Sequence, residues 1–470
     1  MPAAQTAMEK KKRSFAIPHV FVILTIIMAI VWVVSFFVPS GNFERVVDPT
    51  SGREIVNPDV FNYVEKEYIM PDTFFQTFYN GVVGGIGIMG NLLICSGVLG
   101  FLESTGTFSA GIHKLVRATK GKELSLVIIM YVLFNIFGVL GYGEGAYPFY
   151  ALAVTVIMSA GYDRMTGAAA VILGSTGSFA CGMLNMFTTG ISQQIVGLPM
   201  FSGMWYRFVV FLVFFFIGLV FLLQYAIRTR KDPTKSYCYE EYINQDASAS
   251  LGEEVPMDGR RTFALIFFVA LIVVQGYGCV VLGWSFPNIT AMYIIFMIIL
   301  AIVFRVGPTE MCNRFTAGAA RVLGPALAIG FANGVMVLLN EANIMDTVVY
   351  YMSNALQGKS PMITLLIVYV FVTCFNFFVV SGSGKAVMMM PILSPLGQIL
   401  GINQQVMVLT YQMGDGLTNT LWPAGAAVAC SLCGIDYGKW FRFAIKAIGT
   451  MMVAAYVLII IANAIDYGPF

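Results

Sequence analysis

One unusual stretch occurs twice in this sequence. Residues 134–146 read "FNIFGVLGYGEGA", residues 375–387 read "FNFFVVSGSGKAV", and the two align without a gap. In both, glycines and polar residues interrupt an apolar segment, and Glu144 of the first copy stands where Lys385 stands in the second. Weaker matches on either side extend the likeness over most of two halves of the chain. An internal repeat of this length indicates a fold built from two related halves.

The composition shows which solvent surrounds these stretches. Of the 470 residues, 58% are hydrophobic and 11% are charged, and the mean hydropathy is +0.79. Soluble domains carry about 25% charged residues. Apolar runs such as residues 20–39 and 263–282 reach the roughly 20 residues that a helix needs to cross a bilayer. The sequence therefore predicts an all-α polytopic membrane protein.

The repeated stretches lie between apolar segments that are short for full spans. Residues 124–138 and 148–160 flank the first copy, and residues 362–380 and 386–400 flank the second. Non-helical backbone at membrane depth is tolerated where protein buries it or where it lines a watery cavity. We therefore predict a re-entrant hairpin in each half, with the second tip at the Ser-Gly-Ser-Gly-Lys run.

A broken helix is predicted after each hairpin. The interruptions read "STGSFACGMLN" at residues 175–185 and "DGLTNTLWPAG" at residues 415–425. Both contain glycine together with Ser, Thr or Asn, residues suited to a helix break that faces a ligand. Each half thus contributes two polar interruptions.

Basic residues beside the spans predict the orientation of the chain. The N-terminal "EKKKR" and the basic residues around 228–261 indicate the cytoplasmic side, and the acidic loop 41–72 indicates the outside. On this reading the two repeats are inverted relative to each other. We expect a cytoplasmic N-terminus (1–17), a first span with the first repeat (18–228), a cytoplasmic linker (229–261), and further spans with the second repeat (262–470).

Inverted repeats with interrupted segments at matching positions are typical of secondary transporters, whose site lies where the halves meet. The polar and glycine residues of the interruptions are therefore the candidate substrate-binding residues: Asn135, Gly141, Gly143, Glu144, Ser178, Asn185, Asn376, Ser381, Gly382, Ser383, Gly384, Lys385, Asp415, Thr418, Asn419 and Thr420. The coupling ion is left open between Na⁺ and H⁺. The candidate ligands for Na⁺ are Ser381, Asp415 and Thr418.

Several of these residues also fit structural roles. Glu144 and Lys385 could form an ion pair that holds the two hairpins together, beside or instead of a role in binding. Asn135 and Asn376 fit interhelical hydrogen bonding as well as they fit ligand binding. Asp163, in "SAGYDRMTG", is predicted to lie in a surface turn.

Other functions find little support in the sequence. The "GK" at Lys385 is followed by Ala, and Val379 stands where a phosphate loop needs its first glycine. Cys430 and Cys433 form a CxxC without a second pair or a nearby His, which indicates packing. We expect no cofactor, no nucleic-acid partner and no enzymatic activity. A channel is a further alternative. The opposite charges on the paired hairpins favour the closed, alternating site of a carrier over an open channel.

The chain resembles a known family at "NQQVMVLTYQMGDGLTNTLWPAGA" (403–426) and "VGLPMFSG" (196–203), together with the two repeated stretches. It is similar to the C4-dicarboxylate anaerobic carrier family, and within it to the branch of arginine/ornithine antiporters. The resemblance covers nearly the whole chain. It implies a multi-pass protein of the bacterial inner membrane, with a scaffold domain that forms a homodimer and a transport domain that moves as an elevator.

The resemblance leaves the substrate among basic amino acids, dicarboxylates and other small organic acids. Glu144 and Asp415 suit the cationic group of an amino acid, whereas Lys385, Ser381 and Ser383 suit a carboxylate. A basic amino acid or zwitterion is therefore slightly favoured over a C4-dicarboxylate or other carboxylate.

Overall fold

The computed structural model describes residues 20–47, 54–118, 123–141, 146, 148–239, 255–282, 284–377 and 382–468. The chain begins with α1 (Val20–Ser35) and a two-stranded antiparallel hairpin of β1 (Gly41–Val47) and β2 (Glu54–Tyr63). This hairpin occupies the acidic loop and departs from the all-helical prediction; the rest of the described chain is helical. Arg45 of β1 forms an ion pair with Asp346 at 2.9 Å, which fixes the hairpin to the second half.

The remaining elements form two series in the same order. The first series is α2 (Pro71–Ser104), α3 (Thr107–Ala118), α4 (Glu123–Val139), α5 (Pro148–Ser159), α6 (Arg164–Cys181), the π-helix η2 (Met186–Gly190), α7 (Ile191–Ile195) and α8 (Met204–Lys231). After η3 (Pro233–Lys235) come α10 (Gly259–Val281) and α11 (Phe286–Phe304). The second series is α12 (Pro308–Ala320), α13 (Leu323–Glu341), α14 (Met345–Leu356), α15 (Pro361–Phe375), α16 (Gly382–Ile399), α17 (Gln404–Gly416), α18 (Pro423–Cys433) and α19 (Tyr437–Ala464).

Equivalent helices make equivalent contacts. In the first series α6 packs against α4, α5 and α8, and in the second α17 packs against α15, α16 and α19. The halves also exchange contacts, because η2 and α7 pack against α16 while α18 packs against α5. Across the join, α2 meets α13, α6 meets α17, and α8 meets α19. This reciprocal pattern is the one that two halves related by a two-fold axis produce.

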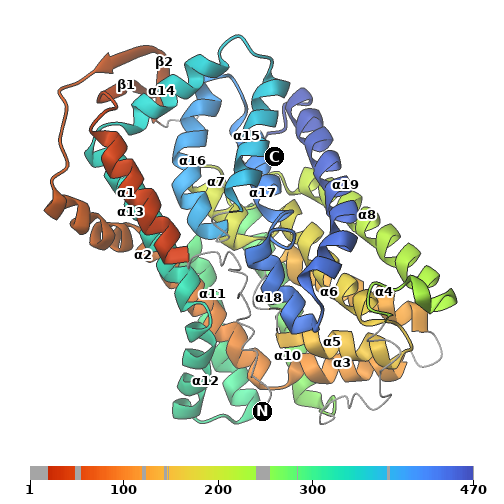
Figure 1. The fold of residues 1–470 in the computed structure, drawn as a ribbon. Helices are drawn as coiled ribbons and strands as arrows, with labels where there is room; N and C mark the ends of the chain where they lie inside the picture. Colours follow the sequence, from red (N-terminus) through yellow and green to blue (C-terminus); the bar gives the residue numbers. More distant parts are fainter. Residues whose placement is uncertain are drawn as a thin grey trace, which may run out of the picture.

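The two hairpins lie at opposite ends of the molecule. Figure 1 shows α4 and α5 in the lower half, near α3, and α15 and α16 in the upper half, near α14 and the β-hairpin. The inverted arrangement of the repeats agrees with the sequence prediction. Five described helices are long and apolar enough to cross a membrane, or six if the bent pair of α13 and α14 is one span.

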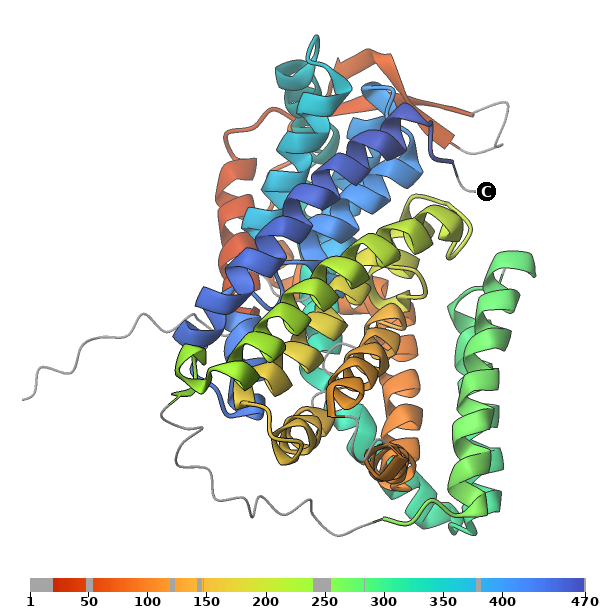
Figure 2. The same cartoon turned by 90° about the vertical axis from the view of Figure 1, so that its right-hand side faces the viewer.

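Glycines bring α2 close to α12 and α13. A Cβ on Gly81 would lie 2.5 Å from the Gly330 carbonyl oxygen, and a Cβ on Gly100 would lie 2.4 Å from the Gly318 Cα. Such close backbone approach is typical of tightly packed membrane helices. Figure 2 shows α10 and α11, drawn in green, at one edge of the molecule beside α2. α11, α12 and α13 therefore pack around α2, and α10 packs against α11 and α3.

Three details of the interruptions differ from the prediction. The first break is shorter than expected, because α6 continues through Ser175 to Cys181 and ends at Gly182, whose φ of +65° glycine adopts without strain. In the second hairpin, Gly382–Lys385 form the first turn of α16 and are not part of a loop. Lys385 is therefore on a helix, where its side chain has a fixed direction. The second break is also shorter, spanning residues 417–422 between α17 and α18.

Candidate functional site

Lys385 and Asp415 form a completely buried ion pair. Lys385 lies on the first turn of α16 and Asp415 on the last turn of α17, and neither side chain is exposed. The ammonium group of Lys385 contacts a carboxylate oxygen of Asp415 and donates a hydrogen bond to Asn376 Oδ1. Buried charges persist in proteins when they are paired in this way. The ion pair that Lys385 forms is thus with Asp415, where the sequence suggested Glu144, which lies outside the described residues together with Gly143 and Ser381.

Asn376 joins the end of α15 to the second break. Its Nδ2 lies 2.8 Å from the backbone oxygen of Asp415, 2.8 Å from Thr418 Oγ1 and 2.9 Å from Asn419 Oδ1. Five predicted residues, Asn376, Lys385, Asp415, Thr418 and Asn419, therefore meet in one cluster. Asn376 has the interhelical hydrogen-bonding role that was one of its two predicted roles.

The equivalent residues of the first half are arranged differently. Asn135 donates to the Tyr131 carbonyl of its own helix at 2.8 Å, and its Oδ1 is buried without a partner among the described residues. Ser178 donates to the Gly174 carbonyl at 2.5 Å and packs against Gly138, where a Cβ would lie 2.0 Å from its hydroxyl. Ser178 therefore serves helix packing, and no counterpart of the Lys385–Asp415 pair appears in the described residues here.

Asn185 begins the half-helix that follows the first break. Its Oδ1 accepts from the backbone N–H groups of Phe187 and Thr188 at 3.1 and 3.2 Å, so it caps η2. Gly141 approaches so closely that a Cβ there would lie 2.3 Å from Asn185 Oδ1. The end of α4 and the first break are thus in contact.

The two halves meet at Gly382. A Cβ there would lie 2.7 Å from Thr188 Cγ2 of the first half and 2.9 Å from Asp415 Oδ2 of the second. Around this contact three polar atoms are buried without a hydrogen-bond partner in the described part of the chain: Asp415 Oδ2, Thr188 Oγ1 and Asn185 Nδ2. Buried polar atoms in native proteins are normally satisfied. Two of these atoms can donate and two can accept hydrogen bonds, which suits a small polar ligand.

Other predicted residues have neighbours elsewhere. Ser383 and Gly384 lie beside Lys385 on the first turn of α16. Thr420 Oγ1 lies 2.6 Å from Thr176 Oγ1 and links the second break to α6. For the Na⁺ site, Asp415 is occupied by the Lys385 ammonium and Thr418 accepts from Asn376. No cluster of three metal-binding side chains occurs within the described ranges.

Sequence reasoning missed Thr188 and Gln412. Thr188 directly follows the first break, in "MFTTG", and Gln412 precedes Asp415 by three residues. Gln412 Nε2 donates to the Phe179 carbonyl at 2.8 Å, and its Oε1 accepts from Thr189 at 3.0 Å. Extending the candidate set to polar residues within one helical turn of each predicted break would have included both Thr188 and Gln412.

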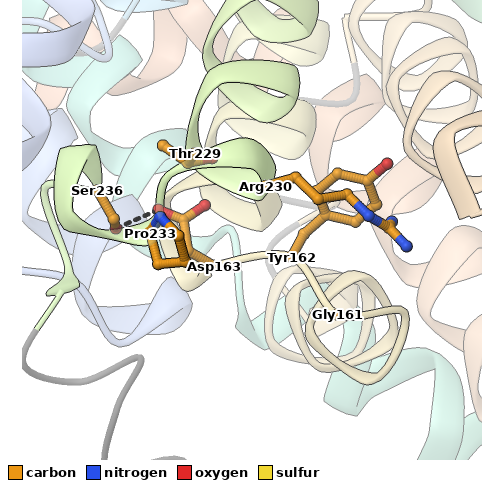
Figure 3. Close-up of a pocket in the computed structure, with 7 residues that line it drawn as sticks. All are labelled: Gly161, Tyr162, Asp163, Thr229, Arg230, Pro233 and Ser236. Atoms are coloured by element: carbon orange, nitrogen blue, oxygen red, sulfur yellow. Dashed lines mark hydrogen bonds between the residues drawn. The ribbon is translucent and has the colours of Figure 1, made fainter.

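A shallow surface pocket lies at the other end of α6. Figure 3 shows its lining residues, with Asp163 hydrogen-bonded to Ser236. Asp163 is 3% exposed, caps α6 and also accepts from Tyr225 at 2.7 Å, so its prediction as a surface turn residue was wrong. The pocket is separated from the first break by the whole length of α6. The hydrogen bond from Ser236 to Asp163 anchors the segment after α8 to the start of α6.

Inverted repeats with two hairpins and two broken helices, meeting at a buried polar site, define a membrane carrier. The chain belongs to the C4-dicarboxylate anaerobic carrier family (DcuC), whose model matches residues 17–464. It is 30% identical to the "putative basic amino acid antiporter YfcC" of Escherichia coli K12, over 97% of this chain and 98% of that protein. It is 24% identical to the citrate/succinate antiporter of the same organism, over 54% of this chain and 51% of that protein.

The fold also matches a solved structure. The Alcanivorax borkumensis YdaH transporter superposes with a TM-score of 0.65 at 16% identity, covering 96% of this chain and all of that one. The predicted family and fold are therefore confirmed. The relatives are carriers and antiporters, so the chain is a transporter and not an enzyme.

Proposed function

We propose that the protein is a secondary active transporter, a symporter or an antiporter, of a small amino acid or organic acid across the bacterial inner membrane. The observation that carries this proposal is the group of unpartnered polar atoms on Asp415, Thr188 and Asn185, buried where the two halves meet at Gly382. The N-terminus of α16 lies at this place and favours negative charge, while the Asp415 carboxylate favours a cation. A substrate that carries both charges fits these surroundings.

A basic amino acid or other zwitterion is the favoured substrate. Asp415 Oδ2 would accept a hydrogen bond from an ammonium or guanidinium group. The antiporter name of the YfcC relative, 30% identical over nearly the whole chain, supports this choice. A C4-dicarboxylate or another carboxylate is the second candidate, because Lys385 offers a cation and a partial relative is named a citrate/succinate antiporter.

Coupling would use H⁺ or an exchanged solute. The Lys385 ammonium contacts one oxygen of the Asp415 carboxylate, and the other oxygen, Oδ2, is assigned above to the cationic group of the substrate, so neither oxygen is left for Na⁺. Transport should therefore persist when Na⁺ is replaced by choline. Loss of transport in choline would show that Na⁺ is the coupling ion, with Asp415 and Thr418 as its candidate ligands.

Alternating access would follow the elevator scheme. The glycine-packed group of α2, α12 and α13, with α1, α10 and α11, would be the scaffold and dimer-forming part. The two hairpins and broken helices would move against it. We propose a cytoplasmic N-terminus and retain residues 229–261 as the cytoplasmic linker between the halves.

Counterflow in proteoliposomes tests the proposal. Arginine, ornithine, lysine, aspartate, succinate and citrate would each be tried as internal and external solute. Exchange of at least one by the wild type, lost in Asp415→Asn and kept in the exposed-site variant Lys446→Gln, is the expected result. Full exchange by Asp415→Asn would exclude this cluster as the substrate site.

A further inference from the structure

Arg207 is a buried cation that the cluster described above does not include. It lies on α8 and none of its surface is exposed. Its Nη1 donates to the carbonyl of Cys181, the last residue of α6, at 3.3 Å. Nε and Nη2 are buried without a hydrogen-bond partner in the part of the chain that the structure describes. The Nε–Nη2 edge of the guanidinium group therefore makes no well-aligned hydrogen bond to the described residues, although the Tyr467 hydroxyl also lies beside the group.

The surroundings leave most of the charge of Arg207 uncompensated. It interacts with the Cys181 carbonyl and with the hydroxyl of Tyr467, which is a hydrogen-bonding neighbour, and both are dipoles without a net charge. The C-terminus of α6 supplies at most about half an elementary negative charge. Burial of an unpaired charge is costly, and proteins normally place a carboxylate beside it. Within the described residues, this arrangement lacks an anion.

The unused atoms are suited to a carboxylate. Nε–H and one N–H of Nη2 point in parallel from the same edge of the guanidinium plane. This edge forms two parallel hydrogen bonds with the two oxygens of one carboxylate. A single oxygen acceptor or a cation would not use it fully.

A chain of contacts connects Arg207 with the Asp415 cluster. The Cys181 carbonyl that it binds lies at the first break, next to Gly182. A Cβ on Gly182 would lie 2.7 Å from Cγ of Gln412, which precedes Asp415 by three residues on α17. Arg207 thus contacts the end of α6, beside the same broken-helix region.

The repeat supplies a matched reference residue. "MWYRF" (204–208) in the first half corresponds to "KWFRF" (439–443) in the second, so Arg442 is the counterpart of Arg207. Arg442 is exposed, whereas Arg207 is fully buried. The burial of Arg207 is therefore specific to the first half and is not a property of the repeated motif.

We propose that the Nε–Nη2 edge of Arg207 binds the carboxylate of the transported substrate. The inference rests on the proposed transport function and adds the residue that recognises the carboxylate, the group that basic amino acids and dicarboxylates share and that simple amines lack. Asp415 and Arg207 would then hold opposite charges of one amino acid.

Binding measurements on the purified full-length protein test the inference. The probes are arginine with its decarboxylated analogue agmatine, and citrate with its ester triethyl citrate. We expect the wild type to bind arginine or citrate and to bind the matching analogue at least about 30-fold more weakly, as loss of a buried charged hydrogen bond requires. Arg207→Gln and Arg207→Lys should show a similar loss for the acid, and Arg442→Gln should bind like the wild type.

Each contrary outcome identifies what failed. Equal binding of acid and analogue by the wild type overturns the role of Arg207 even if the variants do not fold. Wild-type affinity in folded Arg207→Gln overturns it while leaving the transport proposal intact. A requirement for chloride in wild-type binding that is absent in Arg207→Gln would assign the edge to an inorganic anion and overturn its role toward the substrate. A wild type that binds and exchanges none of the probes overturns both proposals.

Discussion

Neutralising one member of the Lys385–Asp415 pair should destabilise the protein strongly. Both side chains are fully buried, so Lys385→Met leaves the Asp415 carboxylate in a medium of low polarity without its cation. Two unit charges in contact attract by roughly 5 kcal/mol at an effective dielectric constant of about 20. Loss of one partner of a buried pair typically costs about 3–5 kcal/mol. Asp415→Leu should have an effect of similar size.

The double variant separates stability from function. Lys385→Met with Asp415→Leu removes both charges while keeping similar volumes, so stability should return to near the wild-type value. Transport should stay absent if the pair acts on the substrate or on coupling. The assay compares thermal unfolding of the purified protein with counterflow in proteoliposomes, and Lys446→Gln, at an exposed position of α19, is the control. Restored transport in the double variant would refute the functional role and leave the pair purely structural.

Three further predictions follow from the packing and the charge pattern. Asn376→Ala should abolish counterflow and lower the free energy of unfolding by about 1–3 kcal/mol, because it leaves buried groups unpaired. Its repeat counterpart Asn135→Ala should have a smaller effect, because Asn135 bonds only within its own helix among the described residues. Equal effects of the two substitutions would contradict this difference between the halves. Gly100→Val should reduce thermal stability by about 1–3 kcal/mol because its Cβ meets backbone at 2.4 Å, whereas Gly87→Ala, with nothing within 4 Å, should be tolerated. A cysteine placed in the 41–72 loop should react with an impermeant thiol reagent in intact cells, and reaction only after permeabilisation would reverse the proposed orientation.

Much of the fold could be predicted because it depends on chemistry repeated along the chain. Hydropathy identified a membrane protein of apolar segments, and the two glycine-rich stretches located the hairpins. The breaks were placed correctly to within a few residues at their C-terminal ends. The start of the first break was wrong because Ser175, Thr176 and Gly177 remain helical, where hydrogen bonds to preceding carbonyls satisfy both hydroxyls. Propensity alone cannot weigh such local bonds against a break.

The candidate site was predicted in its members but not in its pairings. Lys385, Asp415, Asn376, Thr418 and Asn419 were all singled out as polar residues at apolar depth, which the bilayer makes costly. Their partners are decided by how α15, α16 and α17 pack, and these segments are up to 43 residues apart in the hydrogen bonds that join them. The pairing of Lys385 with Asp415 could not be read from the repeat, which aligned Lys385 with Glu144.

The sequence by itself determined that this is a membrane protein of two repeats with polar interruptions, because the bilayer penalises every polar group and so each one stands out. Only the tertiary structure decided which charges are paired. It showed that Arg207 is buried while its counterpart Arg442 is exposed, although the local motif is nearly the same. The reason is that burial and pairing depend on the surfaces that other helices bring to a residue, and those surfaces come from distant parts of the chain.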